Sequence, residues 1–196
     1  PEPGQHGFVV ADVTGKGVPA SLLMATMRAT LRANIQNNPN DIVQALRQVN
    51  GDIYRDSPVD KFITSIYCNL DYHRHEISYV NSGHNPPYIV RADDSRIEEL
   101  EQGGVMLGIM EEIDLPKVTL SIGKGDILML FSDGVTEATN PSGELFSEES
   151  FEQWLLDHNQ LSAEEMKKAL LETLQDYADG SPQSDDITFI IVKRTN

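Results

Sequence analysis

Four aspartates in this sequence stand where a rigid sheet could aim a carboxylate outward. Asp12 directly follows a short apolar run, and Asp133 follows another after one serine. Asp185 and Asp186 stand just before the last apolar run of the chain. Strand-end carboxylates that meet at one sheet edge would suit Mg²⁺ or Mn²⁺, because these hard cations prefer oxygen ligands. The alternative, open for each aspartate taken alone, is a turn residue that hydrogen-bonds its own backbone.

The elements that must position these aspartates alternate along the chain. The apolar run 8–11 predicts a buried strand, and helical spacing of apolar residues predicts helices over 18–35 and 41–54. The first of these helices is apolar nearly all round its first turns, so we expect it to be buried. β-branched and aromatic runs separated by short turns then predict antiparallel hairpins over 62–68, 77–80, 88–90, 118–122 and 127–131.

Two more helices and a strand complete the pattern. One helix is expected to begin near Ser147, and Ser162 with Glu165 forms a capping-box signature for the next. The run 187–192 reads as a buried closing strand. This order predicts the α+β class. The expected architecture is a layered α-β-β-α sandwich of mainly antiparallel sheets, with helix pairs on both faces.

Length and charge narrow the function classes. The 196 residues suffice for one domain, and 15 Lys and Arg against 31 Asp and Glu give a formal net charge of −16. Nucleic acid and anionic membrane surfaces would be repelled, and no apolar run approaches the roughly 20 residues that span a membrane. Cys68 is the sole cysteine, so an internal disulfide is excluded and a reducing, cytoplasmic location is expected.

Four segments carry a family resemblance, and they come in the family's order over nearly the whole chain. The sequence resembles the PPM-type serine/threonine phosphatases, specifically the bacterial SpoIIE/RsbU branch. The matching segments are 12–20 (DVTGKGVPA), 81–87 (NSGHNPP), 130–138 (LFSDGVTEA) and 184–188 (SDDIT).

The resemblance implies a two-metal centre loaded with Mn²⁺ or Mg²⁺. In that assignment Asp12 bridges both ions and the Val13 backbone carbonyl is a further ligand. Asp133 and Asp185 complete the ligand set of the second ion, and Asp186 has a supporting role. A water held between two metals about 3.5–4 Å apart would lose a proton and attack phosphorus in line.

Lys16 lies in the loop after Asp12 and could help to hold the substrate phosphate. A solvated loop lysine is the alternative interpretation. The family also carries an earlier strand with a G-G-D-x-Y type segment whose acidic residue binds metal through water, and nothing before Phe8 matches it. We therefore expect residues 1–196 to form a single phosphatase domain without its first strand or strands. One metal site is then in doubt, and an upstream sensor or receiver domain would precede this fragment.

The function that the resemblance implies is hydrolysis of phosphoserine or phosphothreonine on a signalling protein. In this branch the substrate is typically a STAS-type anti-anti-sigma factor in bacterial stress or developmental signalling. The alternative is a catalytically silent PPM-like module that binds a regulator, which the unmatched acidic strand keeps open. Metal-dependent hydrolysis of p-nitrophenyl phosphate discriminates between the two.

Overall fold

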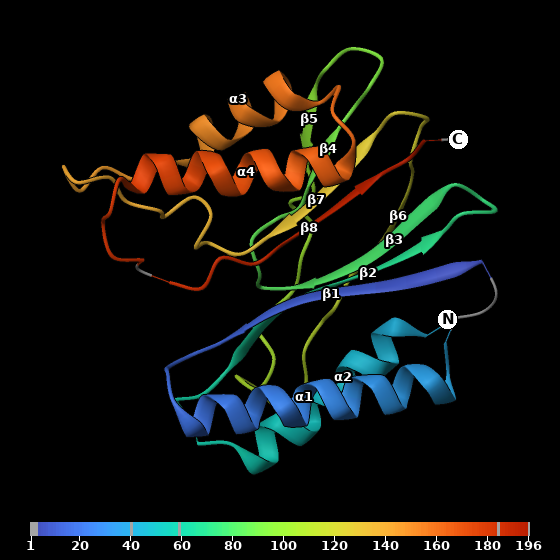
Figure 1. Cartoon of the computed structure of the whole chain (residues 1–196). Coiled ribbons are helices and arrows are strands. Elements are labelled where there is room, and N and C mark those ends of the chain that lie inside the picture. Colours follow the sequence, from blue (N-terminus) through green and yellow to red (C-terminus); the bar gives the residue numbers. More distant parts are fainter. Residues whose placement is uncertain (1–3, 40, 59, 184, 196) are drawn as a thin grey trace. The chain divides into compact units, whose positions relative to one another are not determined.

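The computed structural model describes residues 4–39, 41–58, 60–183 and 185–195 (Figure 1). The chain divides into two compact units, one formed by residues up to 84 with 102–121, the other by 85–101 with the residues from 122 onward. Each unit holds a four-stranded antiparallel sheet and a pair of helices, which confirms the α+β class. Within the described ranges, no helix is both long and apolar enough to cross a membrane.

The first unit carries Asp12 at the end of its edge strand. Its sheet has the order β1-β2-β3-β6, and neighbouring strands run antiparallel with Asp12 opposite Thr64. The helices α1 and α2 lie along one face of this sheet (Figure 1). The elements are β1 (Gln5–Val13), α1 (Val18–Asn37), α2 (Ile42–Asp56), β2 (Ile63–Asp71), β3 (Glu76–Ser82) and β6 (Lys117–Ser121).

The period-two pattern of the strands explains which part of the sheet the helices cover. On the helix-facing side Val13, Ile63 and Val80 are buried against α2 residues such as Leu46. Fully burying side chains of this size contributes about 1.5–3 kcal/mol each. This apolar patch begins directly beside Asp12, so the strand end that presents the carboxylate rests on the core.

Two sequence expectations for this unit need correction. The first helix is not buried all round: Met27, Leu31 and Ile35 are buried at successive i+4 positions, whereas Val18 is 72% and Leu22 64% exposed. The helix touches the core along one stripe only, so the apolar residues outside the stripe remain in solvent. In addition, the first strand starts at Gln5, because β2 continues as far as Asp71 and supplies backbone partners to residues that are not apolar.

Asn50 of α2 clamps the loop that follows residue 102. Its side chain is 1% exposed and accepts a hydrogen bond from the Gly108 N–H at 2.8 Å. The amide nitrogen donates to the carbonyls of Met110 and Glu111 at 3.0 and 2.9 Å. One buried side chain therefore satisfies three backbone groups that have no strand partner there, which ties the loop to the helix.

We predict that Asn50→Leu lowers the free energy of unfolding by about 1–3 kcal/mol, because it leaves the buried Gly108 N–H without a partner and removes two further hydrogen bonds to the loop. Urea unfolding followed by circular dichroism measures this. Gln48→Leu on the exposed side of the same helix is the matched control, and its effect is expected within about 0.5 kcal/mol. Equal stability of the two variants would contradict the clamp.

The second unit carries Asp133, Asp185 and Asp186. Its sheet has the order β5-β4-β7-β8, with the fully buried β7 in its interior. The sequence reading missed the edge strand β5, which is three residues long, polar and only half-buried. The elements are β4 (Tyr88–Val90), β5 (Ile97–Glu99), β7 (Ile127–Phe131), α3 (Glu148–His158), α4 (Ala163–Ala178) and β8 (Phe189–Lys193).

Polar side chains fix the starts of two elements in the second unit, the helix α4 and the strand β7. Ser162 and Glu165 form the expected capping box at the start of α4. Asp126 precedes β7 and accepts hydrogen bonds from the Ala92 and Gly123 N–H groups, and its carboxylate pairs with Arg91 at 2.9 Å. Burial alone would raise the pKa of the Asp126 carboxyl, but these hydrogen bonds and the guanidinium outweigh burial and lower the pKa below its usual value.

Candidate functional site

Asp12 stands on an anchored strand end. The next residue but one, Thr14, donates its N–H to the Phe62 carbonyl at 3.1 Å and accepts the Phe62 N–H on its hydroxyl at 3.1 Å. Val13 is buried in the core between them, while the Asp12 side chain is exposed. Strand pairing on one side and Thr14 on the other therefore fix the Asp12 carboxylate and the Val13 carbonyl in direction.

The loop after Thr14 turns sharply into α1. Gly15 and Gly17 have φ values of +89° and +86°, which L side chains adopt only with strain. The Lys61 ammonium lies against this loop, 2.9 Å from the point that a Cβ on Gly15 would occupy. Lys16, the candidate phosphate ligand from the sequence, is exposed in the same loop.

Residues 81–84 form a turn that contacts β2 opposite Asp12. Asn81 accepts the His84 N–H at 2.8 Å and donates to the His84 carbonyl at 2.9 Å, so the two residues close a tight turn. The buried His84 ring contacts the Thr64 hydroxyl through Nδ1 at 3.0 Å, and Thr64 is the cross-strand partner of Asp12. His84 therefore links this turn to the strand that pairs with Asp12.

In the second unit, the Asp133 loop and the 185–188 segment lie side by side. Ser132 donates its N–H to the Thr188 carbonyl at 2.9 Å and accepts the Thr188 N–H on its hydroxyl at 3.0 Å. The Ser132 hydroxyl also donates to the Asp186 carbonyl at 3.0 Å. A Cβ on Gly134 would lie only 2.4 Å from that same carbonyl oxygen.

The candidate carboxylates differ in exposure. Asp133 and Asp185 are half-buried, and Asp186 is exposed with its N–H donating to the Asp185 carboxylate at 2.8 Å. The structure thus brings the Asp133 and Asp185–Asp186 segments together within the second unit. Over the described ranges, no three His, Cys, Asp or Glu side chains are grouped closely enough to hold a metal ion. The donor set, carboxylates and a backbone carbonyl, suits the oxygen-preferring Mn²⁺ or Mg²⁺.

The sequence reading missed three residues that position this site: Thr14, Ser132 and Lys61. A signal existed for the first two, since each is a hydroxyl residue within two positions of a candidate aspartate at a strand end. No local signal existed for Lys61, because it is far from Gly15 in the sequence and only the β1–β2 pairing brings the two together.

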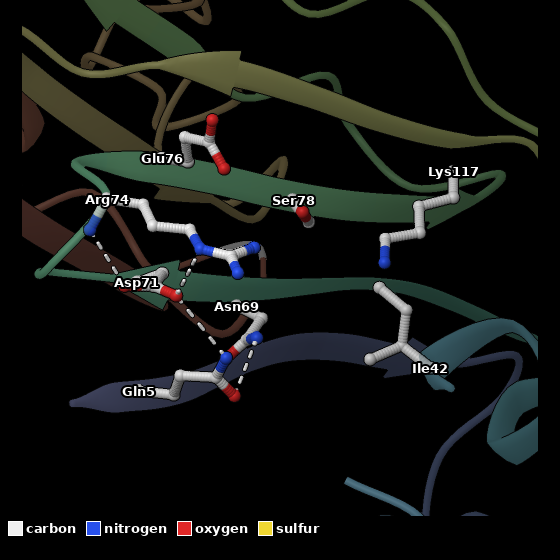
Figure 2. Close-up of a pocket in the computed structure, with 8 residues that line it drawn as sticks. All are labelled: Gln5, Ile42, Asn69, Asp71, Arg74, Glu76, Ser78 and Lys117. Carbon is white, nitrogen blue, oxygen red and sulfur yellow. Dashed lines mark hydrogen bonds and ion pairs between the residues drawn. The ribbon is translucent and has the colours of Figure 1, made fainter. Parts of the chain in front are cut away.

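A separate hollow lies at the other end of the first unit's sheet, away from Asp12 (Figure 2). It has a volume of about 410 Å³. Arg74 lies beside Asp71, with 3.9 Å between the charged atoms. The formal charges of the side chains that line the hollow sum to zero, so the hollow has no net preference for an anion or a cation. Its lining residues are Gln5, Ile42, Asn69, Asp71, Arg74, Glu76, Ser78 and Lys117.

Comparison with solved structures identifies the fold class. The SiaA-PP2C domain of Pseudomonas aeruginosa matches 97% of this chain and 80% of its own length with a TM-score of 0.82 and 20% identity. The RsbU and RsbW domains of Rv1364c from Mycobacterium tuberculosis match with a TM-score of 0.76 and 27% identity, over 98% of this chain and 52% of that chain. The chain therefore has the fold of a PP2C-type phosphatase domain.

The sequence comparison gives the family. The model of the SpoIIE family, Stage II sporulation protein E, matches residues 2–195. The phosphoserine phosphatase RsbU of Bacillus subtilis is 31% identical over 187 residues, which are 95% of this chain and 55% of RsbU. The chain belongs to the SpoIIE family, as the resemblance predicted, and it spans about half the length of that relative.

We predict that Gly134→Ala lowers the free energy of unfolding by about 2 kcal/mol or more, because its methyl group would force apart two backbone segments. Gly51→Ala in α2 is the control. Space is open around Gly51 and it sits within a helix, so alanine should raise stability by about 0.5–1 kcal/mol. Urea unfolding of both variants measures the contrast, and a neutral Gly134→Ala would show that the close approach is dispensable.

Proposed function

We propose that this chain is a protein serine/threonine phosphatase that hydrolyses phosphoserine or phosphothreonine on a signalling partner. The proposal is carried by one observation in a chain of the SpoIIE family. The Ser132 hydroxyl donates to the Asp186 carbonyl, and Gly134 packs closely against the same carbonyl, so the Asp133 loop lies beside the Asp185–Asp186 segment. Two relatives named phosphoserine phosphatase, RsbU and RsbP of Bacillus subtilis, support an enzyme over a silent binding module.

The proposed cofactor is a pair of Mn²⁺ or Mg²⁺ ions. Asp12, the Val13 carbonyl, Asp133 and Asp185 would hold them, with Asp186 in support. When bound, such a pair supplies an acidified water for attack on phosphorus and neutralises charge on the phosphoryl oxygens. This ligand set comes from the sequence motifs, and the oxygen chemistry of the donors is what supports it.

The protein's own contribution is to hold the carboxylates in fixed directions before substrate arrives. Thr14 and Ser132 anchor the two strand ends, so the ligands need little rearrangement. Asp133 and Asp185, both half-buried, come from adjacent segments of one unit, and their like charges repel in the absence of a cation.

The proposed partner is a phosphorylated STAS-type anti-anti-sigma protein. The support is the kinship with RsbU and RsbP, and the charge of −16 disfavours nucleic acid as the substrate. We also propose that residues 1–196 act as a single phosphatase domain. An upstream sensor or receiver domain in the same protein would regulate it. In Rv1364c of Mycobacterium tuberculosis, an RsbU domain shares its chain with an RsbW domain.

We predict that Asp133→Asn lowers Mn²⁺-dependent turnover of p-nitrophenyl phosphate by at least about a hundredfold, because it removes a charged ligand and keeps the size. Asp176→Asn on the exposed side of α4 is the matched control and should retain turnover within about twofold. Circular dichroism checks that both variants fold. Near-normal, metal-dependent turnover of folded Asp133→Asn would refute the ligand assignment.

We predict that millimolar Mn²⁺ raises the melting temperature by several degrees, since an ion that binds only the folded state stabilises it by mass action. Differential scanning fluorimetry at constant ionic strength measures the rise. Asp133→Asn should lose most of it, while Asp176→Asn keeps it. A wild-type melting curve that does not move with Mn²⁺ would show that the carboxylates do not form a cation site.

A further inference from the structure

Lys61 occupies an unusual position for a lysine on the surface of an acidic protein. Its ammonium is folded over the Gly15 backbone, in the loop that directly follows Asp12 and Val13, and its side chain is only 27% exposed. The backbone that carries it is fixed, because the next residue, Phe62, exchanges hydrogen bonds with Thr14. The backbone that carries the Lys61 side chain is therefore fixed by the same contacts that anchor the Asp12 strand end.

The ion pair of Lys61 with Asp60 does not explain this position. The Asp60 side chain is 77% exposed and the charged atoms are 3.5 Å apart, a geometry worth about 0–1 kcal/mol in water. An exposed pair of neighbours forms equally well with the lysine extended into solvent. Holding the ammonium over the loop costs hydration and rotamer freedom, and an anion bound at the loop would offset this cost.

The loop geometry leaves space for this ammonium. Gly15 has no Cβ, and an alanine there would place a methyl group 2.9 Å from Lys61 Nζ besides straining a φ of +89°. The positive φ is what requires glycine at this turn, and the absence of a Cβ also leaves the Lys61 ammonium its present place. An ammonium is a compact point charge with several donors, which suits the oxygens of a phosphoryl group.

We propose that the Lys61 ammonium binds a non-bridging oxygen of the substrate's phosphoryl group and so sets the affinity for the phosphorylated substrate. This inference rests on the proposed phosphatase function. It assigns Lys61 a substrate-binding role and no part in the proton or bond-breaking steps. Lys16, in the same loop but fully exposed, is secondary in this assignment.

Steady-state kinetics with p-nitrophenyl phosphate and Mn²⁺ tests the role, with inorganic phosphate as the competitive product inhibitor. The variants are Lys61→Met, Lys61→Gln in case the first does not fold, and Lys61→Arg. Lys117→Met, on β6 at the opposite edge of the same sheet (Figure 2), is the control for loss of a positive charge. The half-activating Mn²⁺ concentration is measured for each protein alongside KM and kcat.

We expect Lys61→Met to raise KM and the inhibition constant of phosphate together by about tenfold, because a charge-assisted contact is lost. The half-activating Mn²⁺ concentration should stay unchanged, and Lys61→Arg should restore most of the affinity. Lys117→Met should behave like the wild type. An unchanged phosphate inhibition constant in Lys61→Met would overturn the proposal. So would an equal shift in Mn²⁺ activation, which would indicate that Lys61 only supports the Asp12 loop.

Calorimetric titration of inorganic phosphate in the presence of Mn²⁺ separates this inference from the proposed function. If the wild type binds phosphate without turning over substrate, and Lys61→Met weakens the binding about tenfold, the phosphatase proposal fails and the phosphate site stands. If the wild type turns over substrate and Lys61→Met binds phosphate as tightly as the wild type, the phosphatase proposal stands and the Lys61 assignment fails. Absence of phosphate binding by the wild type would overturn the Lys61 assignment.

Discussion

The backbone of Gly134 approaches the Asp186 carbonyl so closely that a single methyl group would not fit between them. This contact requires that β7 and β8 pair in one register, that Ser132 bonds to both Asp186 and Thr188, and that residue 134 has no side chain. A one-residue slip of β8 would break these contacts and turn its side chains to the other face of the sheet. The closeness of two carboxylate-bearing segments thus depends on strand register.

The rest of the second unit supports the strand end that carries Asp133. The aspartates stand at the rim of a sheet whose strand β7 is fully buried and backed by aromatic side chains of α3. Phe131, two residues before Asp133, packs edge-on against Phe151 at 4.9 Å. Rigid apolar packing directly behind the loop therefore limits how far the backbone that carries Asp133 can move.

Features encoded over a few residues were predictable, and features that depend on pairing across the chain were not. The capping box at Ser162 and the strand-end position of Asp133 are local patterns, and both were found as expected. The exposure of Leu22 was missed because helical periodicity shows that a helix is apolar without showing how much of it meets a neighbour. Asn50 and Lys61 could not be assigned at all, because their partners lie on other elements.

Both units use the same device to end a strand beside an aspartate. Thr14 and Ser132 each donate their N–H to a carbonyl of the neighbouring strand, and each accepts the returning N–H on the side-chain hydroxyl. In an ordinary antiparallel pair the acceptor would be the residue's own carbonyl. Because the hydroxyl takes that place, the main chain can leave the ladder at once without orphaning a buried donor. A Ser or Thr at this position therefore allows a rigid strand to turn abruptly into a functional loop, which valine, with the same shape as threonine, could not do.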